Sequence, residues 1–308
     1  YDYLFPVHVF GYNWLQSNAD SAGHLGRYIN KVLASYPDRL AVNTVILVTH
    51  SMGGLVARHH SEVMNGRDNI LGIVHGVMPD LGSPAAYRRM KTGERGIVGA
   101  VIGADAASLM PVLAQSPGPL QLLPGKAYGP GWLKINNGTE TVSKPEADPY
   151  KEIYLNESDW WRLCEKELLQ GDIDKEWENF QIRINKKVID FIEGLAGKYH
   201  PQTYAFYGAS EKHLSDDHLI WQQIPAPRPV MGIPAELPVY RHDAGITFKL
   251  TSSGSAGDGT VPVRAGRIPF SGIRSLLATH VDHEGAYAEG DPGTENGLSA
   301  AMKFPLRS

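Results

Sequence analysis

The sequence VILVTHSMGGLVAR spans Val45–Arg58 and combines two patterns. Its first half is a β-branched apolar run typical of a buried strand, and its second half has the apolar spacing of a helix. Between them, residues 49–53 match the Gly-x-Ser-x-Gly turn, except that Thr49 replaces the first glycine. Such a turn strains the serine backbone and pushes the hydroxyl out of the sheet, and small neighbours let strand and helix approach closely. Ser51 is therefore a candidate nucleophile, and an ordinary helix N-cap serine is the alternative.

The flanking sequence predicts alternating strands and helices. Short apolar runs typical of strands occur at residues 5–10, 42–49 and 69–77. Helical spacing occurs at residues 19–36, 55–60 and 174–195, and further strands are expected at 203–208 and 245–251. Strands joined through helices form right-handed crossovers, which give a parallel sheet. The predicted fold class is α/β, with a mostly parallel sheet flanked by helices.

The composition excludes several classes of function. The chain has 308 residues, 42% of them apolar, and 29 Lys and Arg against 33 Asp and Glu give a net charge of −4. That mild acidity argues against a nucleic-acid partner, which needs clustered positive charge. No apolar run reaches the ~18 residues of a membrane span. Cys164 is the single cysteine, so neither an intramolecular disulfide nor a multi-cysteine zinc site can form.

The middle of the chain breaks the alternation of strands and helices. A long insertion between sheet elements usually covers a site, so we expect residues 85–200 to form a lid or cap with a connecting helix. The alternative is a structural insertion that packs on the sheet edge. Residues 1–84 and 201–308 are then the first and second parts of the core. His213 and His218 have a spacing that a metal site could use, but no further ligand pattern accompanies them, so we expect no metal and no cofactor.

A serine nucleophile needs a general base, and the base needs an acid that orients it. In strand–turn–helix sites of this kind the order along the chain is serine, acid, histidine. Asp258, in GDGTVP at 257–262, follows the later strands, where the acid belongs. A tight turn is the alternative, because Asp-Gly is a common hairpin signal. Asp216, Asp217 and Asp243 are weaker candidates.

Two histidines follow Asp258 and are close enough to the C-terminus to be the base. We favour His283, which precedes an expected helix start, and His280 is the alternative base. Backbone N–H groups at the start of the helix after Ser51 suit a developing oxyanion, so Met52 is the expected oxyanion donor. His50 is expected to pack or to support the site.

These motifs resemble the lipase branch of the α/β-hydrolases. VTHSMGGLVAR at 48–58 and GDGTVP at 257–262 are similar to the lecithin:cholesterol acyltransferase and GPI-inositol deacylase group. The resemblance extends to GYNW at 11–14, PDLGSP at 79–84 and the Tyr-Gly pair at 207–208. Bacterial type VI secretion lipase effectors with a GPI-deacylase-like domain share this arrangement, and the chain resembles them most.

The resemblance implies an α/β-hydrolase fold with a large lid or cap insertion. It also implies that the second oxyanion N–H comes from the loop after the third strand. Only one helix fits between Phe10 and Thr44, so residues 5–10 are expected to be the fourth strand and the third strand to lie before Tyr1. The N-terminal strands are therefore expected to be missing, as in a processed or partial chain. The alternative is that Gly11-Tyr12 supplies the donor in a shortened fold.

The function that the resemblance implies is hydrolysis of lipid esters by a serine esterase, favouring a phospholipid, in an antibacterial secreted effector. Ser51, His283 and Asp258 would be the triad, and Ile97–Leu123 with the following tryptophans would form the lid and acyl-chain surface. Expected partners are the lipid, a transiently contacted membrane surface and an inhibitory immunity protein, with action at a target cell's periplasm or membrane. The alternatives are a carboxylesterase or deacylase for smaller esters, an amidase or transacylase, and a non-catalytic binding module.

Overall fold

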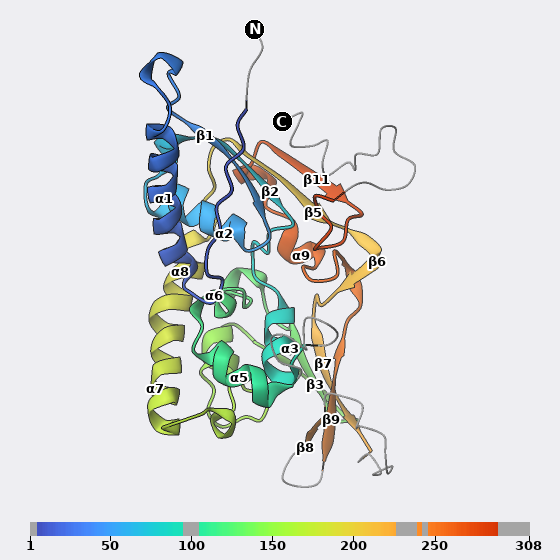
Figure 1. Ribbon diagram of the computed structural model, residues 1–308. Helices are drawn as coiled ribbons and strands as arrows, with labels where there is room; N and C mark the ends of the chain where they lie inside the picture. Colours follow the sequence, from blue (N-terminus) through green and yellow to red (C-terminus); the bar gives the residue numbers. More distant parts are fainter. Residues whose placement is uncertain (1–4, 95–104, 226–238, 242–245, 289–308) are drawn as a thin grey trace.

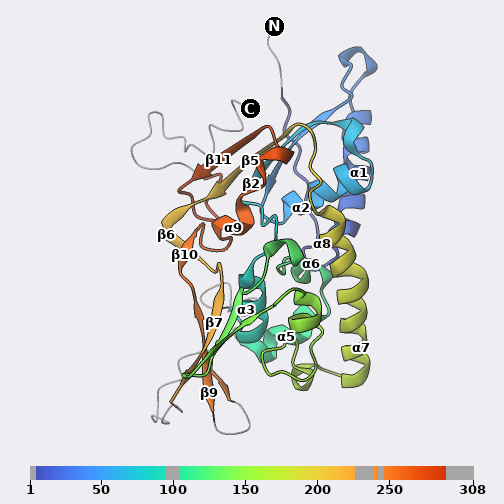
Figure 2. The ribbon, with the colours of Figure 1, turned by 180° about the vertical axis from the view of Figure 1, so that it is seen from behind.

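A computed structural model describes residues 5–94, 105–225, 239–241 and 246–288. The chain forms an upper and a lower body, each built on its own sheet (Figures 1 and 2). The upper sheet has the strand order β1-β2-β5-β11, and every neighbouring pair is parallel. Its strands are β1 (Val45–His50), β2 (Ile70–Gly76), β5 (Thr203–Gly208) and β11 (Ser275–Thr279). The predicted parallel sheet is confirmed.

Helices on one side of the upper sheet bury its apolar residues (Figure 1). They are α1 (Asn18–Ala34), α2 (Gly53–Arg58) and α8 (Ile189–Leu195). Leu25 of α1 and Val56 of α2 share one apolar cluster with Ile73 of β2. α2 continues as a π-helical turn at His59–Val63 and connects β1 to β2 as a parallel crossover.

The lower body, which we call the cap, is built on the sheet β4-β3-β7-β9-β8. Its strands are β3 (Leu133–Asn136), β4 (Thr141–Lys144), β7 (Leu219–Ile224), β8 (Val239–Arg241) and β9 (Thr247–Ser252). Its helices are α3 (Pro84–Thr92), α5 (Ala106–Ala114), α6 (Pro117–Leu120) and α7 (Ile173–Arg183). The predicted helix at 174–195 is α7, a π-helical segment and α8, and it runs from the cap into the upper body (Figure 1).

Two strands, β6 (Ser210–Ser215) and β10 (Ser255–Gly257), connect the upper body to the cap after β5. This antiparallel pair lies between the two sheets, and the short helix α9 (Val263–Gly266) follows (Figure 2). The cap sheet takes β3 and β4 from before residue 200 and β7, β8 and β9 from after it. The division expected at residue 200 therefore does not separate the two bodies.

The apolar residues of the cap form its interior. Leu109, Leu123, Trp132 and Trp221 are each at most 1% exposed and belong to one cluster that spans the cap helices and sheet. Leu109, Leu123 and Trp132 therefore lie inside the cap and not on an acyl-chain surface, whereas the prediction that Ile97–Leu123 and the following tryptophans form a lid stays a prediction. A body with its own sheet must bury one face of that sheet, and these side chains do so. Residues 97–104 lie outside the described residues.

Residues 5–10 do not form the predicted strand. Phe5, Val7 and Val9 are 71%, 89% and 84% exposed, and only Phe10 packs against the α1 cluster. Among the described residues, β1 is an edge strand of the upper sheet, and no strand pairs with residues 5–10. An apolar β-branched run becomes a strand only where a neighbour accepts its backbone hydrogen bonds, so the local pattern overstated this element.

A buried ion pair joins α2 to the turn after β2. Arg58 contacts Asp80, and the two side chains are 2% and 1% exposed. Arg58 also donates to the carbonyl of Leu195 at 2.8 Å, and Tyr199 donates to the second oxygen of Asp80 at 2.7 Å. Removing one member of such a pair leaves a buried charge without compensation.

We expect Asp80→Ala to lower the free energy of unfolding by about 3–5 kcal/mol, because Arg58 would remain buried and unpaired. Chemical denaturation measures this loss. Glu167→Ala is the matched control, since Glu167 pairs with Arg162 while its side chain is 72% exposed. That variant should lose less than about 1 kcal/mol. Equal losses in the two variants would contradict the role given to the buried pair.

Candidate active site

Ser51 lies in a sharp turn between β1 and α2 and has a left-handed backbone with φ 51°. This conformation costs a non-glycine residue of order 1–3 kcal/mol and persists only where the surroundings enforce it. Here Ser51 N donates to Gly76 O at 2.9 Å, and Gly54 N donates to Ser51 O at 2.9 Å. The sequence pattern predicts that Gly53 is the residue at which the helix packs closely against its surroundings. In the structure that residue is Gly54, because a Cβ there would lie 2.6 Å from Met78 Sδ.

The structure brings Ser51, His283 and Asp258 together from three segments of the chain. Ser51 follows β1, Asp258 follows β10 and His283 follows β11. The Ser51 hydroxyl lies 2.8 Å from His283 Nε2, and His283 Nδ1 lies 2.9 Å from Asp258 Oδ2. With Nδ1–H donating to the carboxylate, Nε2 can accept the serine proton. The three side chains form one continuous chain of hydrogen bonds.

Asp258 is fixed by the turn that contains it. The residue is 2% exposed, and its Oδ1 accepts from Thr260 N at 2.8 Å and from Val261 N at 2.6 Å. Its carbonyl accepts from His283 N at 2.8 Å. The Asp-Gly turn and the orienting carboxylate are therefore the same feature: the turn's amides hold one carboxylate oxygen and leave the other for His283.

His283 lies in a turn, not at the helix start that the sequence predicts. Two side chains tie this turn to β1. His50 Nε2 donates to the carbonyl of His283 at 2.7 Å, and the Tyr287 hydroxyl donates to the carbonyl of Thr49 at 2.9 Å. These two hydrogen bonds fix the backbone around His283, as a helix would have done. The sequence pattern assigns no role to Tyr287, and its only signal is its place four residues after His283.

Thr49, which stands where the turn pattern has glycine, is bonded to the neighbouring strand. Its Oγ1 lies 2.9 Å from His75 Nδ1. His75 is 0% exposed, and its desolvation lowers the pKa of the imidazole to about 3. The imidazole therefore stays neutral beneath the turn at ordinary pH, and the threonine hydroxyl is accommodated by a hydrogen bond.

Met52 begins the first turn of α2. Its side chain is buried, and its carbonyl accepts from Leu55 N at 3.0 Å. Its N–H donates to no acceptor in the described part of the chain. This N–H therefore remains available to an oxygen atom bound beside Ser51, as an oxyanion donor must be.

The remaining candidates lie apart from Ser51. His280 is exposed and makes no hydrogen bond to the serine. Asp216 and Asp217 form ion pairs with arginines at 2.8 and 2.9 Å. Asp243 lies outside the described residues. Of the acid and base candidates that the structure describes, only His283 bonds to the serine hydroxyl and only Asp258 bonds to the His283 ring.

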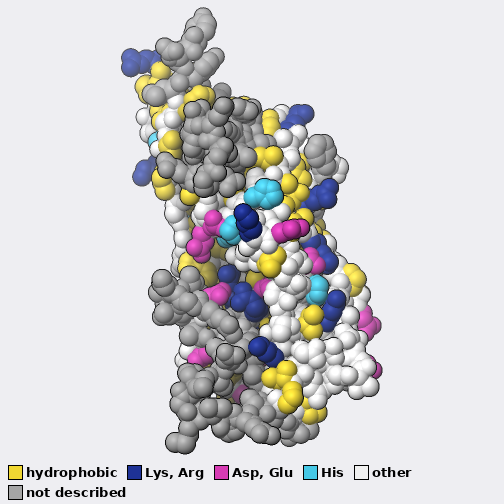
Figure 3. Space-filling model, turned by 90° about the vertical axis from the view of Figure 1, so that its right-hand side faces the viewer, with side chains coloured by type: hydrophobic (Ala, Val, Ile, Leu, Met, Phe, Trp, Pro, Cys, Tyr) yellow, Lys and Arg dark blue, Asp and Glu magenta, His cyan; other side chains and the backbone are white. Residues whose placement is uncertain are grey.

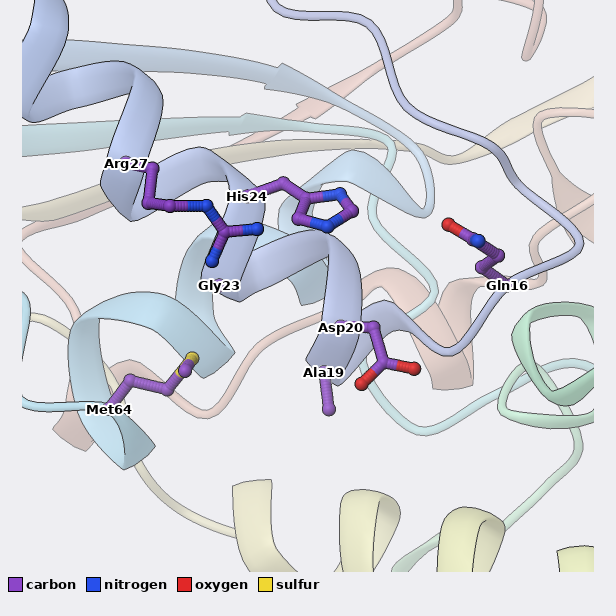
Figure 4. A pocket seen from close by; sticks show the side chains of 7 residues that line it. All are labelled: Gln16, Ala19, Asp20, Gly23, His24, Arg27 and Met64. Atoms are coloured by element: carbon purple, nitrogen blue, oxygen red, sulfur yellow. The ribbon is translucent and has the colours of Figure 1, made fainter.

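The surface of the molecule carries two further features. On the face that carries β6 and α9, basic, acidic and histidine side chains gather near the middle (Figure 3). A depression of about 420 Å³ lies along α1 and is lined partly by Asp20, His24, Arg27 and Met64 (Figure 4). None of the residues that line the depression belongs to the Ser51 site.

The described ranges contain neither a candidate metal cluster nor a candidate membrane-spanning helix. No group of three or more His, Cys, Asp or Glu residues there could hold a metal ion, and this includes the surroundings of His213 and His218. None of the described helices combines the length and the apolar character that crossing a bilayer requires.

The chain shares its fold with a protein of known structure. No family model and no curated protein matches the chain. The chain is similar to the solved Tle4–Tli4 complex, with a TM-score of 0.72 and 30% sequence identity. The match covers 96% of this chain and 64% of that chain, so this chain spans less than two thirds of its length. The parallel sheet, its flanking helices and this similarity establish an α/β-hydrolase fold.

Gly208→Ala is expected to displace Asp258, because the new Cβ would lie 2.5 Å from Asp258 Cβ. The downfield proton resonance of His283 Nδ1–H should shift or disappear, and stability should fall by about 1–3 kcal/mol. Gly194→Ala is the control, since its Cβ would meet open space in α8. That variant should keep the resonance and gain up to about 1 kcal/mol. An unchanged resonance in Gly208→Ala would count against this account of the acid.

Acid should destabilise the fold through His75. The folded-state pKa of about 3 lies below the unfolded value of 6.5, so only the unfolded chain takes up the proton as pH falls below 6.5. Between pH 7 and pH 5 this group should cost roughly 2 kcal/mol of stability. Denaturation at both pH values measures the loss, which should be smaller in His75→Gln. Identical pH dependence in the two proteins would refute this role for His75.

Proposed function

We propose that this chain is a serine esterase of the lipase type that hydrolyses lipid esters. The observation that carries the proposal is the hydrogen-bonded chain from the Ser51 hydroxyl through His283 to Asp258. A buried carboxylate that orients an imidazole, and an imidazole that accepts a serine proton, are the requirements for nucleophilic attack on an ester. A non-catalytic module has no need of the strained backbone that presents this serine.

The reaction would proceed in two steps. Ser51 Oγ attacks the ester carbonyl carbon as His283 Nε2 takes the hydroxyl proton, and the Met52 N–H stabilises the oxyanion. Collapse of the tetrahedral intermediate breaks the bond to the alcohol, which leaves with the proton from His283. Water then attacks the acyl-enzyme with His283 again acting as base, so the acid is released and Ser51 regains its proton. Asp258 stays ionised and orients the imidazole throughout.

We propose a phospholipid as the substrate and an antibacterial effector as the biological role. Two observations support this: the motif resemblance to type VI lipase effectors, and the structural similarity to Tle4, a type VI lipase effector. In this proposal the upper body carries the chemistry. The cap covers it, with its apolar interior serving as a rigid support and not as the acyl-binding surface. The enzyme would act at the membrane or in the periplasm of a target cell.

An inhibitory protein partner belongs to the same proposal. The similar structure is a complex of Tle4 with Tli4, an immunity protein. By analogy, this chain would be blocked by a protein that covers the entrance to Ser51. Such a partner should prevent hydrolysis of micellar lipid while leaving the fold intact.

Ser51→Ala should abolish hydrolysis of a phospholipid in mixed micelles, because it removes the hydroxyl that faces His283 Nε2. Released fatty acid and lysophospholipid, identified by mass spectrometry, report both the rate and the position of cleavage. Ser158→Ala, at an exposed serine of the cap, is the control and should keep full activity. Activity retained by Ser51→Ala would reject the proposed nucleophile.

A series of esters with increasing acyl length separates a lipase from a carboxylesterase with the same triad. We expect the rate to rise with chain length and to increase when the substrate forms micelles. Fast cleavage of acetyl esters with none of micellar lipid would exclude the lipase function while leaving the serine esterase in place.

A further inference from the structure

The Tyr12 hydroxyl lies beside the turn that carries Ser51. A Cβ placed on Gly53 would lie 3.8 Å from this hydroxyl, and no other non-neighbouring atom comes within 4 Å of that point. Gly53 is the second residue after Ser51 and belongs to the first turn of α2. The phenol therefore reaches the open side of the same helical turn whose Met52 N–H is the proposed oxyanion donor.

The Tyr12 hydroxyl is a hydrogen-bond donor without an acceptor among the described residues. Buried phenols elsewhere in the chain are satisfied: Tyr154 donates to Pro124 O at 2.6 Å and Tyr287 to Thr49 O at 2.9 Å. Desolvation raises the pKa of Tyr12 to about 12, so the phenol keeps its proton at neutral pH. A half-buried hydroxyl that has no hydrogen-bond partner within the described residues is free to donate to a bound acceptor.

Packing and hydrogen bonds hold Tyr12 in place. Its ring stacks on Phe10 at a centroid distance of 6.1 Å and packs against the apolar cluster shared by α1 and α2. The loop that follows is tied to the cap, since Gln121 Oε1 accepts from Asn18 N at 2.8 Å and Gly118 N donates to Leu15 O at 3.3 Å. The phenol is thus preorganised, which is the condition for transition-state stabilisation by a fixed donor.

We propose that Tyr12 is a catalytic residue whose hydroxyl donates the second hydrogen bond to the oxyanion formed when Ser51 attacks an ester. This inference rests on the proposed esterase function. It adds the donor that the turn alone does not provide, because Met52 contributes a single N–H. The oxyanion oxygen would then lie between a backbone amide of α2 and a phenol from the segment before α1.

Tyr12→Phe removes this donor and retains the ring. We expect kcat for a p-nitrophenyl ester to fall by about 10²-fold or more, with KM changed by less than a few-fold. A thionoester with C=S in place of C=O accepts a hydrogen bond weakly, so the rate ratio of ester to thionoester should also shrink in Tyr12→Phe. A purely structural defect would not alter that ratio.

Tyr28→Phe is the matched control, because Tyr28 also packs on Phe10 at 5.5 Å but lies along α1. It should keep wild-type kcat and the wild-type ester-to-thionoester ratio, and both variants should keep the wild-type Tm within a few degrees. Wild-type kcat in Tyr12→Phe, or an unchanged ratio, would overturn the role of Tyr12 while the esterase stands. A wild-type protein that hydrolyses no ester would overturn the esterase and this inference together.

Discussion

The left-handed backbone at Ser51 is the constraint on which the site depends. A non-glycine residue holds this conformation only under external restraint, and here the restraint is the parallel pairing of β1 with β2 together with close packing at Gly54. The hydroxyl is thereby presented at the end of the sheet where β5 and β11 also finish. Parallel strands end at the same edge, so the segment after β11 brings His283 beside the serine. Asp258 follows β10, outside this sheet, and packs against Gly208 at the end of β5.

The cap and the upper body are joined by polar contacts at points that bear on the site. Ser83, which caps α3, donates to the carbonyl of Thr260 at 2.9 Å, within the turn that holds Asp258. Gln121 of the cap is 2% exposed and donates to Lys187 O at 2.8 Å while accepting from α1. Buried polar groups are costly unless satisfied, so these contacts specify one arrangement of the two bodies. The cap thus helps to position the acid as well as to cover the sheet.

Local patterns predicted the elements whose structure is decided locally. The β-branched run before Ser51, the helical spacing after it and the Asp-Gly turn at Asp258 each carry their signal in a few adjacent residues. The failure at residues 5–10 came where a distant partner decides, because this run has strand propensity but pairs with no strand in the described part of the chain. The burial of Trp132 likewise depends on the cap sheet, whose strands come from distant parts of the sequence. Tyr287 was missed because its role depends on where its hydroxyl lies in space, which spacing along the chain does not encode. Gly11-Tyr12 was considered as a donor only through the family resemblance, and its spacing gave no sign that the phenol lies beside Gly53.

The most direct test of the central claim is a crystal structure of the chain after reaction with a lipid-like fluorophosphonate. The account predicts a single phosphorus atom bonded to Ser51 Oγ, with His283 still bonded to Asp258 and the phosphonyl oxygen facing the Met52 N–H. Modification of a different residue, or a phosphonyl oxygen pointing away from α2, would contradict it.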